Sequence, residues 1–458
     1  MRASTGAEKI GIPSVSFVIT DFIPLANHTA RGEGMPGIRI AEYPGAIQTH
    51  SDAEIGETVE KRIVDSVVEG LTGKLVENRV DLTGHDPTAI VFEGTFEEVN
   101  EFFYRRGWTD GLPIVPPTIP KVKEFLKYTD RGADEEIAVL PLSYLRATPW
   151  NIAVNAVMAG CRPEYMPVLI AAVEAIADPE FRLKDIGNTC GCRPFFLVNG
   201  PITKDLAIYS GTGLMSPGAK RLGTVTTAAN PNSTIGRALH LIVQNIAGFR
   251  PSESEMAVFG HAQSFVIAEN EEETPWEPYH VEQGFERATS TVTAMAWMGT
   301  IGPESESKGD RAFLHLKSIG MELRNGMHPI AYRFGDRVMI CVLMVPPIAK
   351  VIATEGYSKR SAAEQIFEES RMSVRQINER LQGEMDTVHS YVEGGNAPKS
   401  LDLESDRLIP AVLRPDLIHI VVCGSRHRNR TLILYSFYVH PVTKEIKMPA
   451  NWGKSQKR

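Results

Sequence analysis

The residues of this chain with the clearest capacity for chemistry are Cys190 and Cys192, which are separated by a single glycine. Glycine and proline around the pair (DIGNTCGCRP) predict a loop that enters an apolar strand near Phe195. Such a loop can bind a soft transition metal, cycle as a redox dithiol or supply an attacking thiolate. The alternative is that both thiols are inert, because free cysteine usually behaves as a small buried hydrophobe. We expect at least one of the two to be functional.

A second candidate is the small-residue loop 210–218 (SGTGLMSPG), which is followed by Asn232 and Ser233 at the start of a helix. Small residues let backbone N–H groups approach an anion, and a helix N-terminus adds partial positive charge. The glycines lack the spacing of a P-loop or of a dinucleotide-binding turn. We therefore expect Asn232 and Ser233 to bind an anion or a substrate carboxylate, the alternative being an ordinary capped helix behind a surface loop.

Acid–base residue types gather in segment 261–282, which contains His261, Glu277 and His280. Their spacing differs from that of a zinc protease helix, in which two histidines lie four residues apart. We expect His280, with Glu277 or Glu282, or else His261 to act as the acid–base group beside the cysteine pair.

A basic stretch follows the apolar run 417–423 and contains Arg426 and Arg428. Ligands of α/β sheets gather at the carboxyl ends of strands, and guanidinium groups pair carboxylates and phosphates bidentately. We expect Arg426 and Arg428 to bind an anion; a solvated loop between two strands is the alternative.

The composition bounds the function. The chain has 458 residues, a formal net charge of −8 and five cysteines. Dispersed Lys and Arg argue against a nucleic-acid partner, and the longest apolar run is too short to span a bilayer. An odd number of scattered cysteines and the lack of a secretory signal favour a reducing compartment, so we expect a cytoplasmic protein that binds a small-molecule substrate.

The first unit, residues 1–92, is expected to be the latter part of a doubly wound α/β domain. Apolar runs predict strands at 15–20 and 38–41, and residues at spacings of three and four predict a helix over 52–69. The unit opens on a helix, 2–10, where an α/β domain normally opens on a strand. The missing strand would leave an exposed sheet edge, so we expect at least a homodimer.

Residues 93–458 are expected to form a larger α/β domain that carries the Cys190–Cys192 loop. Buried strands are predicted at 337–345, 417–423 and 431–439. Segments 152–163 and 240–251 both end a helix with Ala-Gly-x-Arg-Pro, which indicates either internal duplication or generic helix-stop chemistry.

Several phrases resemble a known family. They are GWTDGLPIVPPT, NIAVNAVMAGCRPEYMPVLIAAVEAI, LVNGP, NSTIGRALHLI and AENEEETPWEPYHVE. Together they look like the large C-terminal domain of bacterial UGSC-type (seleno)proteins, over roughly 95–440. Residues 1 to about 75 look like the latter part of the UGSC-like domain that precedes it, and that domain is distantly similar to the selenoprotein B subunit of glycine reductase.

This chain departs from the family at its reactive motif. The family's Sec/Cys-Gly-Ser-Cys motif follows the first strand, and this chain begins just beyond that position, at MRASTGAEK. The motif is encoded upstream, supplied by a partner subunit, or lost. No residue from 1 to 30 therefore inherits the nucleophile role.

The leading functional expectation is an enzyme of reductase or lyase type that acts on a small carboxylate- or sulfur-containing metabolite. Cys190 and Cys192 would be thiolate nucleophile or ligands of a transition metal, completed by His261 or His280. The alternatives are a metal-dependent hydro-lyase or hydrolase without redox change, and a non-catalytic subunit of a heteromeric complex.

Overall fold

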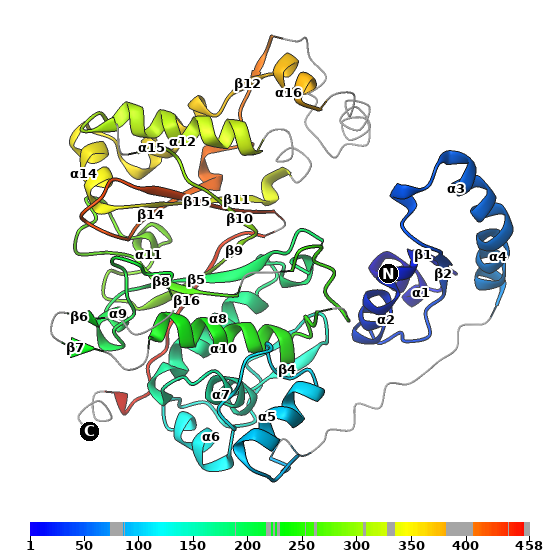
Figure 1. Cartoon of the computed structure of the whole chain (residues 1–458). Helices are drawn as coiled ribbons and strands as arrows, with labels where there is room; N and C mark the ends of the chain where they lie inside the picture. The colour runs from blue at the N-terminus through cyan, green and yellow to red at the C-terminus, as the bar shows by residue number, and fades with distance from the viewer. Residues whose placement is uncertain are drawn as a thin grey trace.

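The computed structural model describes most of the chain. The described residues are 1–73, 86, 88–187, 189–216, 221–222, 225–226, 230–251, 253–260, 263–305, 308–327, 335–381, 406–437 and 439–452. Within them the architecture is mixed α/β, as the sequence predicts (Figure 1).

The N-terminal unit alternates helices with two parallel strands. Its elements are α1 (Arg2–Lys9), β1 (Ser16–Ile19), α2 (Ile23–Gly32), β2 (Ile40–Tyr43), α3 (Asp52–Thr58), a π-helical turn (Val59–Ile63) and α4 (Val64–Thr72). Ser16 pairs with Ile40 and Ile19 with Tyr43, so α2 is the crossover between the strands. Ala41, Tyr43 and Ile63 form a small core of their own. Among the described residues each strand has one neighbour and one open edge.

A helical segment comes next. It contains α5 (Phe96–Arg105), α6 (Ile119–Leu126), the β3–β4 hairpin (Ala138–Leu140, Leu145–Ala147), α7 (Pro149–Met158) and α8 (Met166–Ala177). The expected capping box between Thr95 and Glu98 is present, and Thr148 caps α7 ahead of Pro149. These caps satisfy N–H groups that a helix start leaves unpaired.

Two four-stranded mixed sheets form the centre. The first has the order β16–β9–β5–β8 (Val442–Glu445, Thr291–Trp297, Arg193–Asn199, Val266–Ala268). The second has the order β10–β15–β11–β14 (Gly299–Ile301, Thr431–Phe437, Val338–Met344, Ile418–Val422). In each sheet one pair is parallel, β5 with β8 and β11 with β14, and the other pairs are antiparallel.

The two sheets share one topology and exchange their last strands. The four strands β5, β8, β9 and β10 form one half in chain order, and β11, β14, β15 and β16 form the other; the first three strands of each half occupy equivalent places in their sheets. The next strand then crosses over, because β10 follows β9 but pairs with β15, and β16 follows β15 but pairs with β9. The repeat is thus carried by strand order. The Ala-Gly-x-Arg-Pro segments do not mark it, since they end α7 and α10 (Pro231–Asn245), which pack together in one half.

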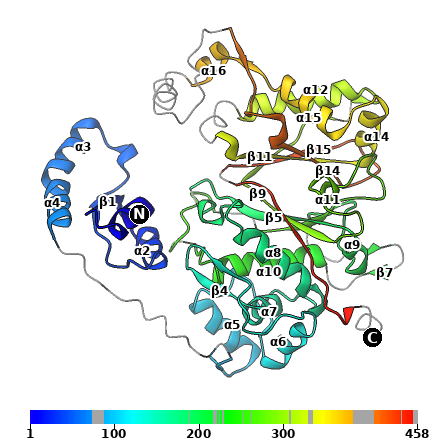
Figure 2. The same cartoon turned by 180° about the vertical axis from the view of Figure 1, so that it is seen from behind.

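The sheets lie face to face between two layers of helices (Figures 1 and 2). Phe195, Leu197 and Met295 of the first sheet pack against Cys341 and Leu434 of the second. The outer face of the first sheet is covered by α8 and α10, with α7 behind them. The outer face of the second is covered by α12 (Ala312–Met327), α14 (Pro346–Thr354) and α15 (Lys359–Glu369). Each sheet therefore has helices on one face only, unlike a doubly wound sheet.

Short elements connect these layers or extend from them. They are α9 (Ile202–Asp205), β6 (Arg221–Leu222), β7 (Val225–Thr226), α11 (Tyr279–Glu282), β12 (Met372–Ser373), α16 (Val374–Leu381) and β13 (Leu408–Ile409). Of these, α9 and α11 lie at the end of the sheets where β5 and β8 finish (Figure 1).

Candidate functional site

A cavity of about 980 Å³ opens at the carboxyl ends of β5, β8 and β14. It is lined by residues of three segments, 200–212, 268–273 and 424–427, and by Arg287. Residues 210–212, 268–273 and 424–427 belong to stretches that the sequence singles out for small residues, acid–base groups or arginines. Ligands of α/β sheets bind at this end of parallel strands, and here the strands of both halves converge. We call this space the strand-end cavity.

Glu271 is held at the wall of the strand-end cavity by main-chain geometry. Its Oε1 accepts hydrogen bonds from the Gly200 N–H (2.6 Å) and from Asn199 Nδ2 (3.0 Å). Gly200 has φ of 87°, and a Cβ there would lie 2.5 Å from the Thr289 carbonyl oxygen, so glycine is required. Glu271 is thus fixed in place, with its side chain 21% exposed.

His280 lies directly behind Glu271. Its side chain is fully buried, and Nδ1 is 3.9 Å from Glu271 Oε1. His280 Nδ1 has no hydrogen-bond partner among the described residues, while Nε2 is 3.4 Å from the Arg287 carbonyl oxygen. The two atoms would have to approach by about 0.7 Å or more to form a hydrogen bond and share a proton. A carboxylate beside an imidazole is an arrangement suited to general acid–base chemistry.

A buried ion-pair network joins the two halves beside this pair. Glu269 accepts hydrogen bonds from Asn199 Nδ2 (2.7 Å) and from the Tyr279 N–H (2.6 Å). Lys359, at the start of α15, places Nζ 3.4 Å from Glu269 Oε1 and 3.0 Å from Glu282 Oε2. Burial raises the pKa of the Glu282 carboxyl, against the lowering effect of Lys359. The network fixes the acidic segment between the sheets, because buried charges persist only where partners are close.

Asn232 shapes the strand-end cavity without lining it. Its side chain is buried, accepts from the Tyr209 N–H (2.8 Å) and donates to the Tyr209 carbonyl (2.9 Å). Asn232 thereby holds the small-residue loop over the N-terminus of α10. Neither Asn232 nor Ser233 is among the described residues that line the cavity. Whether Asn232 or Ser233 binds an anion stays a prediction, because the described contacts show only that Asn232 supports the loop.

Of the two predicted anion-binding arginines, one lines the strand-end cavity and the other does not. Arg426 lines the strand-end cavity, is 65% exposed and lies 3.5 Å from Glu273. Arg428 is exposed and is not among the lining residues.

Glu277 is 60% exposed and forms an ion pair with Arg287, so its predicted acid–base role is not supported. His261 lies outside the described residues.

The cysteine pair lies at the other end of β5. Cys192 immediately precedes Arg193, the first residue of β5, whereas Gly200 follows the last. Seven residues of strand at about 3.3 Å each separate the two ends by roughly 20 Å. The expectation that the pair lies beside His280 is therefore wrong, because an extended strand stands between them.

The two thiols also differ from one another. Cys192 is fully buried, with Ser436 Oγ 3.7 Å from its sulfur, and Cys190 is exposed. None of the five cysteines is in a disulfide. Within the described part of the chain no three His, Cys, Asp or Glu side chains are grouped to hold a metal ion, so nothing there completes the predicted transition-metal site at the pair.

Comparison with known proteins identifies the first unit. Residues 1–73 match the UGSC family. The chain carries a UGSC-type domain at its N-terminal end. The match ends before the strand-end cavity begins, so the family describes β1, β2 and their helices but not the two exchanged sheets. No curated protein and no solved structure matches the chain. None of the described helices is long and apolar enough to cross a membrane.

Some site residues had no distinct signal in the sequence. Asn199 and Gly200 follow a predicted apolar strand, so the strand-end rule could have indicated them. Lys359 lies about 90 residues beyond Glu269 and follows an ordinary helix-capping serine, Ser358. Only the packing of the second half on the first brings that lysine to Glu269. The UGSC-type domain contributes no described residue to the strand-end cavity.

Proposed function

We propose that this protein is an enzyme that performs acid–base chemistry on a small carboxylate-bearing metabolite in the strand-end cavity. The observation that carries the proposal is the Glu271–His280 pair, with one carboxylate facing the cavity and one buried imidazole behind it. A lyase or hydrolase reaction fits best, because both need proton transfer at a positioned base. The five cysteines outside disulfides suit a reducing compartment, and we place the enzyme in the cytoplasm.

Each residue has a distinct role in this proposal. Glu271 removes a proton from the substrate. His280, which lies behind Glu271, then shares that proton with the Glu271 carboxylate. Arg426 binds the substrate carboxylate, which displaces the loosely paired Glu273 at 3.5 Å. Lys359 and Glu269 act as positioning residues, because their buried ion pair holds the acidic segment in place.

The experiment is a binding and turnover screen with small hydroxy, keto and amino acids. Calorimetry identifies the ligand, and product formation is then followed for Glu271→Gln and Glu277→Gln. Glu271→Gln should lower kcat at least a hundredfold with little change in KM, because the base is lost and the shape is kept. Glu277→Gln is the matched control and should keep wild-type turnover. Equal activity of the two variants would overturn the proposal.

A second candidate is thiolate chemistry at Cys190, which is the exposed member of the pair. Gly191, with φ of 79°, reverses the chain between the two thiols and leaves Cys190 outside. Turnover that is lost in Cys190→Ser but kept in Glu271→Gln would favour this candidate. A stable complex with a second protein that restores turnover would favour the role of a subunit.

A further inference from the structure

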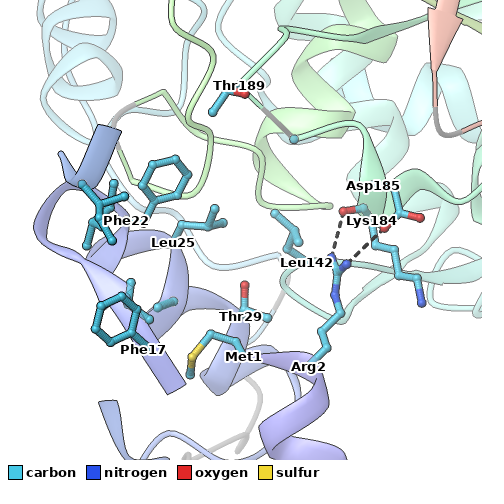
Figure 3. A pocket seen from close by; sticks show the side chains of 15 residues that line it. Met1, Arg2, Phe17, Phe22, Leu25, Thr29, Leu142, Lys184, Asp185 and Thr189 are labelled. Carbon is cyan, nitrogen blue, oxygen red and sulfur yellow. Dashed lines mark hydrogen bonds and ion pairs between the residues drawn. The ribbon is translucent and has the colours of Figure 1, made fainter. Parts of the chain in front are cut away.

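A second cavity lies between the UGSC-type domain and the rest of the chain, and its walls are largely apolar (Figure 3). It measures about 730 Å³. Phe22 and Leu25 lie on one side and Leu142 on the other, with the Arg2–Asp185 ion pair (3.1 Å) at its edge. Phe17, on β1, also lines it and is 48% exposed. An apolar cavity with a polar edge is typical of sites for small organic ligands.

This apolar cavity adjoins a more polar one of about 1210 Å³. Phe22 and Thr189 line both, so we treat the two as one junction cleft. The residue before Cys190 thus lies on its wall. The strand β1 ends at this cleft, which is the end of a parallel strand where α/β domains bind ligands.

Most charges in the polar part of the junction cleft are already neutralised. Arg193 and Glu255 form a fully buried ion pair, and Asp110 is bound by Arg237 through two contacts of 2.8 Å. Arg250 differs from these. Its side chain lines the cleft and is 31% exposed, and its nearest carboxylate, Glu253, is 3.6 Å away and 63% exposed. A partly exposed guanidinium that is only loosely paired favours an anionic ligand group.

The loop that follows Glu255 exposes large apolar side chains beside the junction cleft. Val258 is 69% exposed and lines the cleft, and Phe259 is completely exposed. Water contact with two such neighbouring side chains is unfavourable, so a contiguous apolar surface here marks a binding function. The loop is anchored by the buried Glu255 at one end and has Gly260, with φ of 79°, at the other.

We infer that the junction cleft binds a carboxylic acid with an apolar body, such as a medium-chain alkyl carboxylate. The hydrocarbon part packs against Phe17, Phe22 and Leu142, and the carboxylate accepts hydrogen bonds from Arg250. Val258 and Phe259 pack over the hydrocarbon and lose their exposure to water. Both the UGSC-type domain and the larger region contribute to this site, which explains why the domain is held against that region.

The test is calorimetry of the full chain with butyrate, hexanoate and octanoate. Affinity should rise about fourfold for each added methylene, because each one buries apolar surface. Octan-1-ol should bind at least tenfold more weakly than octanoate. In Arg250→Gln this difference between acid and alcohol should disappear. Equal affinity for the three acids, or no binding of octanoate below millimolar concentration, would overturn the inference.

Two further variants separate this site from a general loss of folding. The double variant Val258→Ser/Phe259→Ser should bind octanoate at least fivefold more weakly, and its fold is safe because both side chains are solvent-exposed. The matched control is Ile10→Ser, which removes a 74% exposed apolar residue that lines neither part of the cleft and should bind as the wild type does. The Glu271→Gln variant should also bind octanoate as the wild type does. A lack of octanoate binding would therefore not count against the proposed enzyme function, and a lack of turnover would not count against the junction cleft.

Discussion

At the scale of single residues, one glycine gives Cys190 and Cys192 opposite environments. Gly191 adopts a φ of 79°, so the chain turns and the second thiol enters the core while the first stays outside. Alkylation by iodoacetamide requires contact with solvent. We expect one thiol of the native protein to react rapidly.

The measurement is mass spectrometry of tryptic peptides after brief alkylation. Cys190 should be modified within minutes, whereas Cys192 should react only after unfolding. Cys161 should also stay slow, because burial raises the pKa of its thiol. The variant Cys190→Ser should lose the rapid phase and Cys192→Ser should retain it. Rapid modification of Cys192 in the native protein would contradict the burial described here.

His419 on β14 is predicted to make stability depend on pH. Burial lowers the pKa of this imidazole to about 4; Asp416 opposes this effect and His440 adds to it. Because the folded state takes up its proton later than the unfolded state, the unfolded chain binds more protons between about pH 6.5 and pH 4. The free energy of unfolding should therefore fall as the pH drops through this window, by about 1 to 3 kcal/mol from this group.

Urea unfolding at pH 7, 5 and 4 checks this expectation. In His419→Asn the amide oxygen can accept the bond that joins Nδ1 and the Tyr279 hydroxyl, 3.1 Å apart, but it cannot titrate. The variant should lose less stability than the wild type between pH 7 and pH 4. Identical pH dependence of the two proteins would exclude His419 as a contributor.

At the scale of the element, β5 depends on a buried ion pair at its first residue. The side chains of Arg193 and Glu255 are 2% and 1% exposed and pair bidentately. Removing one partner leaves a buried charge without compensation, so Glu255→Gln should lower the free energy of unfolding by about 3 to 5 kcal/mol. Arg193→Met/Glu255→Met should lower it less, because no charge stays buried.

Chemical denaturation of these variants gives the measurement. Lys61→Gln is the matched control, since it breaks an exposed ion pair with Glu57 and should cost less than about 1 kcal/mol. If Arg193→Met/Glu255→Met is less stable than Glu255→Gln, the expectation is wrong, and the ion pair itself stabilises the fold.

At the scale of the whole molecule, the exchange of β10 and β16 ties each half to the other. Val442, on β16, belongs to the core of the first half although it lies about 150 residues from its partner Ala294 on β9. Val442→Asp buries a charge without a partner, so stability should fall by roughly 3 kcal/mol or more. Amide hydrogen exchange should accelerate in β9 before it does in β11. The control variant Glu445→Gln, at an exposed position on β16, should leave both strands protected. Equal acceleration in β9 and β11 would contradict the pairing of β16 with β9.

The oligomeric state stays a prediction. Both strands of the UGSC-type domain have an open edge within the described residues, and Val64, Val68 and Leu71 expose an apolar face of α4. Open edges and exposed apolar faces favour association. Light scattering at micromolar concentration should show at least a dimer, and a monomer would refute the expectation.

The helices and strands could be predicted from the sequence, because apolar periodicity and capping residues lie within the segments that they indicate. Strands expected at 15–20, 337–345, 417–423 and 431–439 are present within a few residues, as are the caps at Thr95 and Thr148. Periodic apolar residues and capping side chains act over one or two turns, so neighbours in sequence suffice to indicate them. The UGSC resemblance over the first unit is confirmed by the family match to residues 1–73.

Which of these elements pair or pack together depends on the tertiary structure. Strand pairing depends on contacts between residues far apart in sequence, so β10 and β16 could not be assigned to the opposite half. The same is true of the site: Lys359 reaches Glu269, and Asn232 turns out to support the strand-end cavity without lining it. Cys192 and His280 were expected together from their residue types. The length of β5 keeps them apart, because an extended strand separates what stands at its two ends.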